Sequence, residues 1–206
     1  MPASELFSGL ELVLLDRDGV INEESDRFIR RPAEWLPVEG SIDAIVRILA
    51  FASIAVCTNQ SGIGRGLFTL ETLAAIHRRM HGLIANAGGA AVDVYFCPHL
   101  PDAHCDCRKP SPGLLLDAMR AFDIAPDATA FVGDSRRDLE AAEAKGIYPP
   151  ALVFFPNNAV VTIQDTVEVE VYAMKIENVG MAQIEVHYEA NKLSVESVIQ
   201  GSLFQG

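Results

Sequence analysis

The sequence predicts an α/β fold, a doubly wound parallel sheet with helices on both faces, followed by a short antiparallel β segment. Up to about residue 150, short apolar runs alternate with segments whose apolar residues recur every three to four positions. This is the pattern of buried strands alternating with amphipathic helices. Further on, "TVEVEVYA" alternates apolar and polar residues, as half-buried antiparallel strands do. We therefore divide the chain into a domain at 1–150 and a β-rich tail at 151–206.

The elements of the first domain can be placed in order along the chain. The apolar runs expected to be strands are residues 12–15, 53–57, 92–96 and 129–132. The segments with helical spacing are residues 41–51, 69–87, 112–122 and 136–146. Ser41 and Thr69 are expected to be helix N-caps, and Gly146 is expected to stop the last helix. In such a sheet, ligands bind beyond the carboxyl ends of the strands.

The tail has a different character. Its strand-like stretches are residues 166–173, 183–189 and 192–199, and "YPPALVFFPNN" before them reads as a linker because of its prolines and asparagines. The apolar residues 152–155 within this linker can also supply a last strand to the first domain.

Composition and charge exclude several classes of partner. The 206 residues carry a formal net charge of −12, which disfavours binding to nucleic acid or to an anionic membrane. No apolar run approaches the ~20 residues of a membrane span, and the first residues do not resemble a signal peptide. We expect a cytoplasmic, monomeric protein that acts on a small molecule, and an anionic substrate would need local positive charge or a metal.

Polar residues follow three of the predicted strands. "LVLL" runs into Asp16, "SIAVC" into Thr58 and "TAFVG" into Asp134, while Lys109 lies shortly before the helix predicted at 112–122. Parallel strands would bring these residues to one edge of the sheet. Asp18 lies two positions after Asp16, and at an effective dielectric of about 20 two such charges ~4 Å apart repel by about 4 kcal/mol. A bound cation is the obvious compensation.

This set of side chains fits phosphoryl transfer. Asp16 and Asp134 would hold Mg²⁺, which takes oxygen ligands, and one carboxylate at the metal would attack phosphorus. Thr58 and Lys109 would donate hydrogen bonds to the phosphoryl oxygens. Asp18 would protonate the leaving oxygen and then activate water, which requires a carboxyl pKa raised towards neutrality.

A cysteine-rich loop, "CPHLPDAHCDC", suggests a second metal site. Cys97, His99, Cys105 and Cys107 offer three sulfurs and one nitrogen, the ligand set of a structural Zn²⁺ site. The alternatives are reduced thiols or a disulfide, and His104 can replace His99 as a ligand. His77 and His81 stand four residues apart in a predicted helix, and we expect surface or packing roles for both because no third ligand is near in the sequence.

Four motifs resemble, in order, those of the haloacid-dehalogenase (HAD) superfamily of phosphatases. They are "DRDGVIN", "TNQSGIGRG", "CDCRKPSPG" and "VGDSRRDLEAA", and the resemblance runs from about residue 11 to 147. It implies a HAD-like Rossmannoid fold without a large cap. It also implies that Asp16 is the nucleophile and Asp18 the acid/base, and that Asp16, Asp134 and the carbonyl oxygen of Asp18 bind Mg²⁺.

Within the superfamily, the sequence is most similar to phosphatases that remove the 7-phosphate of D-glycero-D-manno-heptose 1,7-bisphosphate, in heptose biosynthesis for lipopolysaccharide. Histidinol-phosphate phosphatases are the alternative, but they typically have an aspartate after "TNQ" and lack the arginine of "TNQSGIGRG". In this resemblance Arg108 recognises substrate and Arg65 adds positive charge for a second phosphate. The residues expected to line the substrate pocket are Glu24, Ser25, Asp26, Arg27, Asn59, Gln60, Ser61, Arg65, Arg108 and Ser135.

The tail from about residue 157 resembles the first part of a cohesin-type β-sandwich. Only three or four of the strands such a sandwich needs are present. A hypothesis of another class is therefore a cohesin-like module that binds a protein partner and carries an inactive phosphatase domain.

Overall fold

The computed structural model describes residues 9–144, 147, 152–155 and 170–173. The strands are β1 (Leu12–Leu15), β2 (Ser53–Asn59), β3 (Asp93–Cys97), β4 (Thr129–Val132), β5 (Leu152–Phe155) and β6 (Glu170–Ala173). The α-helices are α2 (Ser41–Leu49), α3 (Leu70–Asn86), α4 (Gly113–Phe122) and α5 (Arg136–Glu143). Three short 3₁₀ turns lie at η1 (Pro32–Glu34), η2 (Pro101–Ala103) and η3 (Pro126–Ala128).

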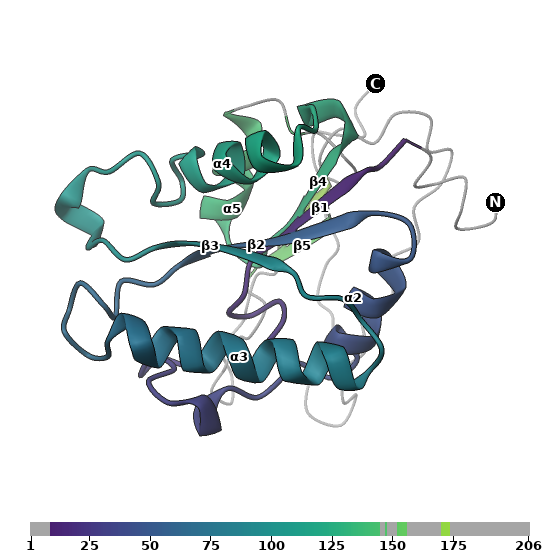
Figure 1. Ribbon diagram of the computed structural model, residues 1–206. Coiled ribbons are helices and arrows are strands. Elements are labelled where there is room, and N and C mark those ends of the chain that lie inside the picture. Colours follow the sequence, from purple (N-terminus) through teal and green to yellow (C-terminus); the bar gives the residue numbers. More distant parts are fainter. Residues whose placement is uncertain (1–8, 145–146, 148–151, 156–169, 174–206) are drawn as a thin grey trace, which may run out of the picture.

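Four strands form a parallel sheet in the order β3-β2-β1-β4. Helices α4 and α5 cover one face, and α2 and α3 cover the other (Figure 1). The predicted α/β class is therefore confirmed. The central strand β1 is buried on both faces, which is why it reads as an uninterrupted apolar run.

Alternate residues of the strands face two separate cores. Leu12 and Leu14 of β1 pack with residues of α4 and α5, whereas Val13 and Leu15 pack on the side of α2 and α3. Because side chains alternate along a strand, each of the two faces of the sheet gains an apolar layer from the same four residues. The two cores hold the sheet rigid, and the sheet in turn positions the loops that follow its strands at the carboxyl edge.

The predicted helix ends had mixed outcomes. Thr69 is an N-cap, because its side chain accepts a hydrogen bond from the backbone N–H of Thr72. The prediction for Ser41 is wrong: Gly40 is the N-cap, with φ of 78°, and Ser41 begins the helix. The Ser41 hydroxyl donates instead to the carbonyl of Ile21 at 2.8 Å. Gly146 lies outside the described residues.

The described part of the tail forms a two-stranded antiparallel sheet of β5 and β6. Residues 152–155 therefore do not extend the parallel sheet as a fifth strand, and that expectation is wrong. They pair with residues 170–173, which belong to the predicted alternating stretch. The other strand-like stretches of the tail lie outside the described residues.

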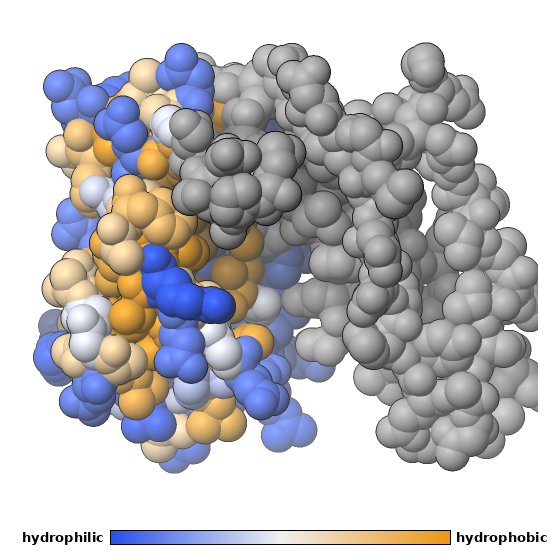
Figure 2. Space-filling view, turned by 90° about the vertical axis from the view of Figure 1, so that its right-hand side faces the viewer, coloured by the Kyte–Doolittle hydropathy of each residue, from blue (hydrophilic) through white to orange (hydrophobic). Residues whose placement is uncertain are grey.

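The amino ends of the parallel strands form the end of the sheet away from the predicted site. An open hollow of about 520 Å³ lies there, lined by Leu49, Phe51 and Phe122 among others. Figure 2 shows this side of the molecule, where apolar side chains of the described residues gather in a band broken by hydrophilic ones. None of the predicted catalytic residues lines the hollow. Among the described residues, no helix is long and apolar enough to span a bilayer.

Candidate functional site

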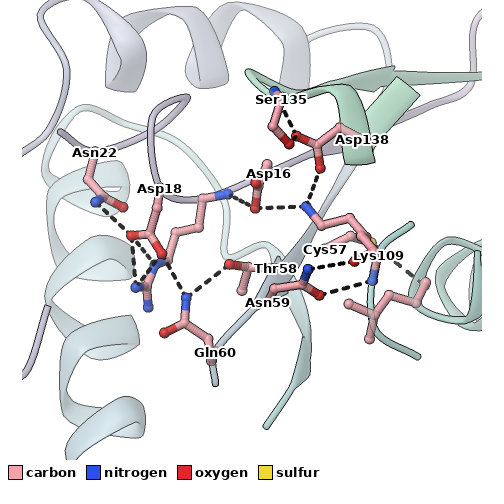
Figure 3. A network of polar contacts seen from close by, with 12 residues as sticks. Asp16, Asp18, Asn22, Cys57, Thr58, Asn59, Gln60, Lys109, Ser135 and Asp138 are labelled. Atoms are coloured by element: carbon pink, nitrogen blue, oxygen red, sulfur yellow. Dashed lines mark hydrogen bonds and ion pairs between the residues drawn. The ribbon is translucent and has the colours of Figure 1, made fainter. Parts of the chain in front are cut away.

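The carboxyl edge of the sheet brings together residues that are far apart in the sequence. Asp16 directly follows β1, Thr58 lies in β2, and Asp134 follows β4 after one glycine. Lys109 reaches the same place from the loop before α4, and its Nζ lies 3.0 Å from Oδ1 of Asp16 (Figure 3). The structure therefore places the predicted residues at one edge.

Asp138 belongs to this cluster and was not predicted. Its Oδ1 lies 2.7 Å from Nζ of Lys109, so the ammonium group sits between two carboxylates (Figure 3). Its Oδ2 accepts hydrogen bonds from the Ser135 backbone N–H at 3.0 Å and from the Ser135 hydroxyl at 2.6 Å. The first of these, together with a hydrogen bond from the Asp138 backbone N–H to the Ser135 side chain, forms a capping box at the start of α5. Gly133 leaves room for it, because a Cβ there would collide with the Asp138 side chain.

The spacing of "SRRD" was the available signal for Asp138. A serine followed three residues later by an acid marks a helix start, and it fixes the acid at the amino end of the helix. Since this helix follows directly on the strand carrying Asp134, the acid had to lie near the predicted site.

The cluster holds more negative than positive charge. Oxygens of Asp16, Asp134 and Asp138 lie within 4.8 Å of one another. Burial raises the pKa of Asp16 to about 6, although Lys109 opposes the shift. Burial and the charges of Asp16 and Asp138 raise the pKa of Asp134 to about 7. Burial favours neutral Lys109, but the charges of Asp16 and Asp138 outweigh it and raise its pKa.

This donor set fits a hard cation. Three closely spaced carboxylates face the ammonium group of Lys109, and the raised pKa values of Asp16 and Asp134 mean that a further positive charge nearby would stabilise both ionised carboxylates. Carboxylate oxygens are the ligands that Mg²⁺ takes in proteins.

Asp18 is held on the other side of Asp16. Its Oδ1 accepts hydrogen bonds from Nη2 of Arg17 at 2.9 Å and from Nδ2 of Asn22 at 2.9 Å. Its Oδ2 accepts from Nη2 of Arg17 at 3.0 Å and from Nε2 of Gln60 at 2.8 Å. Burial alone would raise its pKa, but the Arg17 charge and these hydrogen bonds lower it. The expected upward shift is therefore wrong for the protein without substrate.

The "TNQ" residues support the site from β2 and the turn after it. Asn59 clamps the backbone of Lys109, because its Oδ1 accepts from the Lys109 N–H and its Nδ2 donates to the Lys109 carbonyl, each at 3.1 Å. Gln60 donates through Nε2 to the Thr58 hydroxyl at 3.0 Å as well as to Asp18. The Thr58 hydroxyl accepts there, so its own proton can be donated to another group.

The four predicted zinc ligands converge at the end of β3. Nδ1 of His99 lies 3.5 Å from Sγ of Cys97 and 3.3 Å from Sγ of Cys107, and Sγ of Cys105 lies 3.6 Å and 3.5 Å from those two sulfurs. All four cysteines of the chain are free thiols, which removes the disulfide alternative in this structure. The four ligand atoms lie within 4.8 Å of one another, and His104 is not among them. This geometry suits one tetrahedral ion.

The remaining predicted substrate-binding residues differ in their exposure. Residues 24–27 are exposed, and the charge of Glu24 contributes to the raised pKa of Asp134. Arg65 is exposed and lies over the ring of Phe28, 5.9 Å from its centroid. Arg108 donates to the carbonyl of His99 at 3.3 Å, whereas Ser61 is buried.

Comparison with known proteins settles the family. A family model described as HAD-hydrolase-like matches residues 106–152. The chain is 49% identical over 141 residues to D-glycero-beta-D-manno-heptose-1,7-bisphosphate 7-phosphatase of Pseudomonas putida, and the match covers 68% of this chain and 81% of the relative. The chain belongs to this phosphatase family of the HAD hydrolases.

Other members of the family agree. The enzyme of the same name from Neisseria meningitidis is 48% identical over 145 residues, which cover 70% of this chain and 77% of that one. The crystal structure of D,D-heptose 1,7-bisphosphate phosphatase from Bordetella bronchiseptica, complexed with magnesium and phosphate, matches with a TM-score of 0.65 at 46% identity. That match covers 68% of this chain and 79% of the other. The resemblance to HAD phosphatases is thus confirmed.

Proposed function

We propose that the chain is a Mg²⁺-dependent phosphatase that removes the 7-phosphate of D-glycero-D-manno-heptose 1,7-bisphosphate. The observation that carries this proposal is the cluster in which Lys109 bridges Asp16 and Asp138 beside Asp134. It unites a nucleophile, a cation site and a fixed positive charge, and the activity for which the relatives are named supplies the substrate. The chain is thus a phosphoric monoester hydrolase whose partner is a small sugar phosphate.

The first step would be attack by Asp16 on phosphorus. Asp16 and Asp134, with the carbonyl oxygen of Asp18, would hold Mg²⁺, which would neutralise charge on the carboxylates and on the phosphoryl oxygens. A carboxylate oxygen of Asp16 would form a bond to phosphorus as the bond from phosphorus to the substrate oxygen breaks, which leaves an aspartyl-phosphate. Thr58 and Lys109 would donate hydrogen bonds to the phosphoryl oxygens, on which charge is spread in the transition state.

Asp18 would act as the general acid and then as the general base of the reaction. In the free protein it is a carboxylate held by Arg17, Asn22 and Gln60. An arriving phosphate adds negative charge nearby, which raises the pKa of a carboxyl group. Asp18 would then protonate the leaving oxygen and afterwards take a proton from the water that hydrolyses the aspartyl-phosphate.

Zn²⁺ at Cys97, His99, Cys105 and Cys107 would shape the rim of the site. The four protein ligands would occupy all four coordination positions of a tetrahedral ion, so no position is left for a catalytic water. Because Arg108 and Lys109 directly follow Cys107, the ion would fix where both side chains begin. We infer that Arg108, Arg65 and the exposed loop at 24–27 contact the substrate.

The decisive experiment measures phosphate release by the purified full chain with Mg²⁺, comparing the heptose 1,7-bisphosphate with histidinol phosphate. We expect fast release from the bisphosphate and none from the Asp16→Asn variant, which keeps the size of the side chain but removes the nucleophile. Preference for histidinol phosphate would keep the mechanism and overturn the substrate. Substantial activity of Asp16→Asn would overturn Asp16 as the nucleophile.

A further inference from the structure

The proposed mechanism leaves one buried contact unused, between α3 and the loop after β1. Nη1 of Arg17 lies 3.3 Å from Nε2 of His77, although the two residues stand 60 positions apart in the sequence. Both are buried, with 1% of Arg17 and 9% of His77 exposed. We propose that His77 is a positioning residue, whose neutral imidazole holds the Arg17 guanidinium so that Arg17 orients Asp18 for proton transfer. This inference rests on the proposed function.

The chemistry of the pair fixes the direction of the hydrogen bond. An arginine side chain has donors only, so Nε2 of His77 must be the acceptor and the ring proton lies on Nδ1. Burial and the Arg17 charge lower the pKa of His77 to about 4, which keeps the ring neutral near pH 7. The ring also contacts Phe96 of β3, with centroids 6.3 Å apart, so its orientation is restricted by packing.

The edge of the Arg17 guanidinium that faces away from His77 is hydrogen-bonded to Asp18. Nε and Nη2 of Arg17 both donate to Asp18, at distances of 2.9–3.2 Å. Nη1 is therefore the end that His77 alone satisfies among the described residues. A buried donor left without a partner is costly, so a guanidinium without His77 would turn to find another acceptor. Such a rotation of the guanidinium would break the hydrogen bonds from Nε and Nη2 of Arg17 to Asp18.

The network links α3 to the reacting groups. The backbone N–H of Arg17 donates to Oδ1 of Asp16 at 2.7 Å, so one residue contacts both aspartates of the "DRD" motif. From Asp18 the hydrogen bonds continue through Gln60 to Thr58. Loss of the His77 acceptor should therefore alter proton transfer by Asp18 more than binding of substrate.

The test compares two leaving groups. A sugar alkoxide needs a proton from Asp18 as it departs, whereas the nitrophenolate of p-nitrophenyl phosphate leaves without one. The ratio kcat/KM reports the steps up to formation of the aspartyl-phosphate, so it isolates this difference. For His77→Leu we expect kcat/KM to fall about 10-fold or more with the heptose bisphosphate, since general acid catalysis contributes roughly 100-fold or more. With p-nitrophenyl phosphate it should change by less than about 2-fold.

Two further variants separate positioning from packing. His77→Gln offers Oε1 as an acceptor to Arg17 and should restore most of the lost kcat/KM. His81→Leu is the matched control, because His81 lies one turn further along α3 and contacts the carbonyl of Val92 at 2.9 Å rather than Arg17. It should leave the ratio between the two substrates unchanged. Equal losses with both substrates in His77→Leu, or no rescue by His77→Gln, would overturn the proposal.

A measurement without turnover keeps this inference separate from the proposed function. In the ¹⁵N NMR spectrum of histidine-labelled protein, the His77→Gln variant identifies the His77 signals. We expect a protonated Nδ1 and an unprotonated Nε2 at pH 7, and a protonated Nε2 would contradict the contact with Arg17. Wild-type protein that hydrolyses p-nitrophenyl phosphate but not the bisphosphate would refute the substrate, while the tautomer would still decide for or against the Arg17–His77 hydrogen bond.

Discussion

At the scale of single residues, the two carboxylates around Lys109 determine its charge and its position in the site. This ammonium group is 1% exposed and contacts the carboxylates of Asp16 and Asp138 at 3.0 Å and 2.7 Å. A buried charge is stable only when it is paired and hydrogen-bonded. The two carboxylates therefore keep Lys109 protonated, and Asp138 allows it to remain in place when Asp16 reacts with phosphate.

Asp138→Asn tests this balance. The amide still caps α5 but removes one of the two charges that face Lys109, so the ammonium group is drawn more strongly to Asp16, the proposed nucleophile. Removing one partner of a buried ion pair generally lowers the free energy of unfolding by about 3–5 kcal/mol. Because Asp16 still pairs with Lys109, we expect a loss of roughly 1–3 kcal/mol here. We expect phosphate release to fall by roughly 100-fold, measured with Mg²⁺ at saturating substrate.

The matched control is Asp117→Asn on α4. Asp117 pairs with Arg120 at 3.1 Å, but both side chains are more than half exposed, and such pairs contribute about 0–1 kcal/mol. Its unfolding free energy and activity should stay close to those of the wild type. If Asp138→Asn behaved like this control, Asp138 would have no part in holding Lys109.

At the scale of elements, the cysteine loop between β3 and α4 would, with its proposed zinc ion, fix the position of the backbone at Arg108 and Lys109, which directly follow Cys107. Cys105→Ser should lower the zinc content from about one ion per chain and reduce thermal stability, since structural zinc sites contribute directly to folding. Metal analysis of the dialysed protein measures the first effect. Unchanged zinc content would remove Cys105 from the ligand set.

Cys57→Ala separates loss of zinc from loss of stability. Cys57 is buried in β2 and does not belong to the cluster of four ligands. Removing its sulfur leaves a small cavity, so the unfolding free energy should drop while the zinc content stays the same. Zinc loss in this variant as well would mean that general destabilisation, rather than ligand removal, releases the ion.

The elements also show which features could be predicted from sequence. Strands β1 and β4 match their predicted ranges. Strand β1 is buried throughout and reads as an apolar run, as buried parallel strands do. Convergence of Asp16, Thr58 and Asp134 followed from parallel topology alone. Ser41 is not the N-cap because the helix boundary lies one residue earlier, at Gly40, whose positive φ of 78° suits a glycine.

The missed contacts share one physical cause. The expected packing role of His77 agrees with its burial and its contact with Phe96, but it did not include the contact with Arg17, and Asp18 was expected to have a raised pKa. Both expectations ignored Arg17, which enters the core and joins the two residues across 60 positions. Local periodicity places a residue on an element, but it does not reveal which buried charge from another element will need it as a partner.

At the scale of the whole molecule, the two cores and the proposed site lie in one continuous part of the chain. Among the residues whose burial the structure describes, those of both cores fall between Leu12 and Ile147, and the proposed catalytic and zinc-binding residues lie within the same range. The matches to the phosphatase family likewise cover about two thirds of the chain, 68–70% for the relatives compared above. A folding unit at 1–150 would therefore contain everything that the proposed reaction requires.

Limited proteolysis of the full chain tests this division. A non-specific protease should leave an N-terminal fragment that ends beyond Ile147, because a cut before that residue would remove part of the core packed on α4 and α5. The fragment should retain zinc and release phosphate in the presence of Mg²⁺ at a rate within about 2-fold of the full chain. Its mass identifies the boundary. Loss of activity on cleavage beyond residue 150 would show instead that the segment after the parallel sheet is needed to complete the enzyme, and the division at 150 would be wrong.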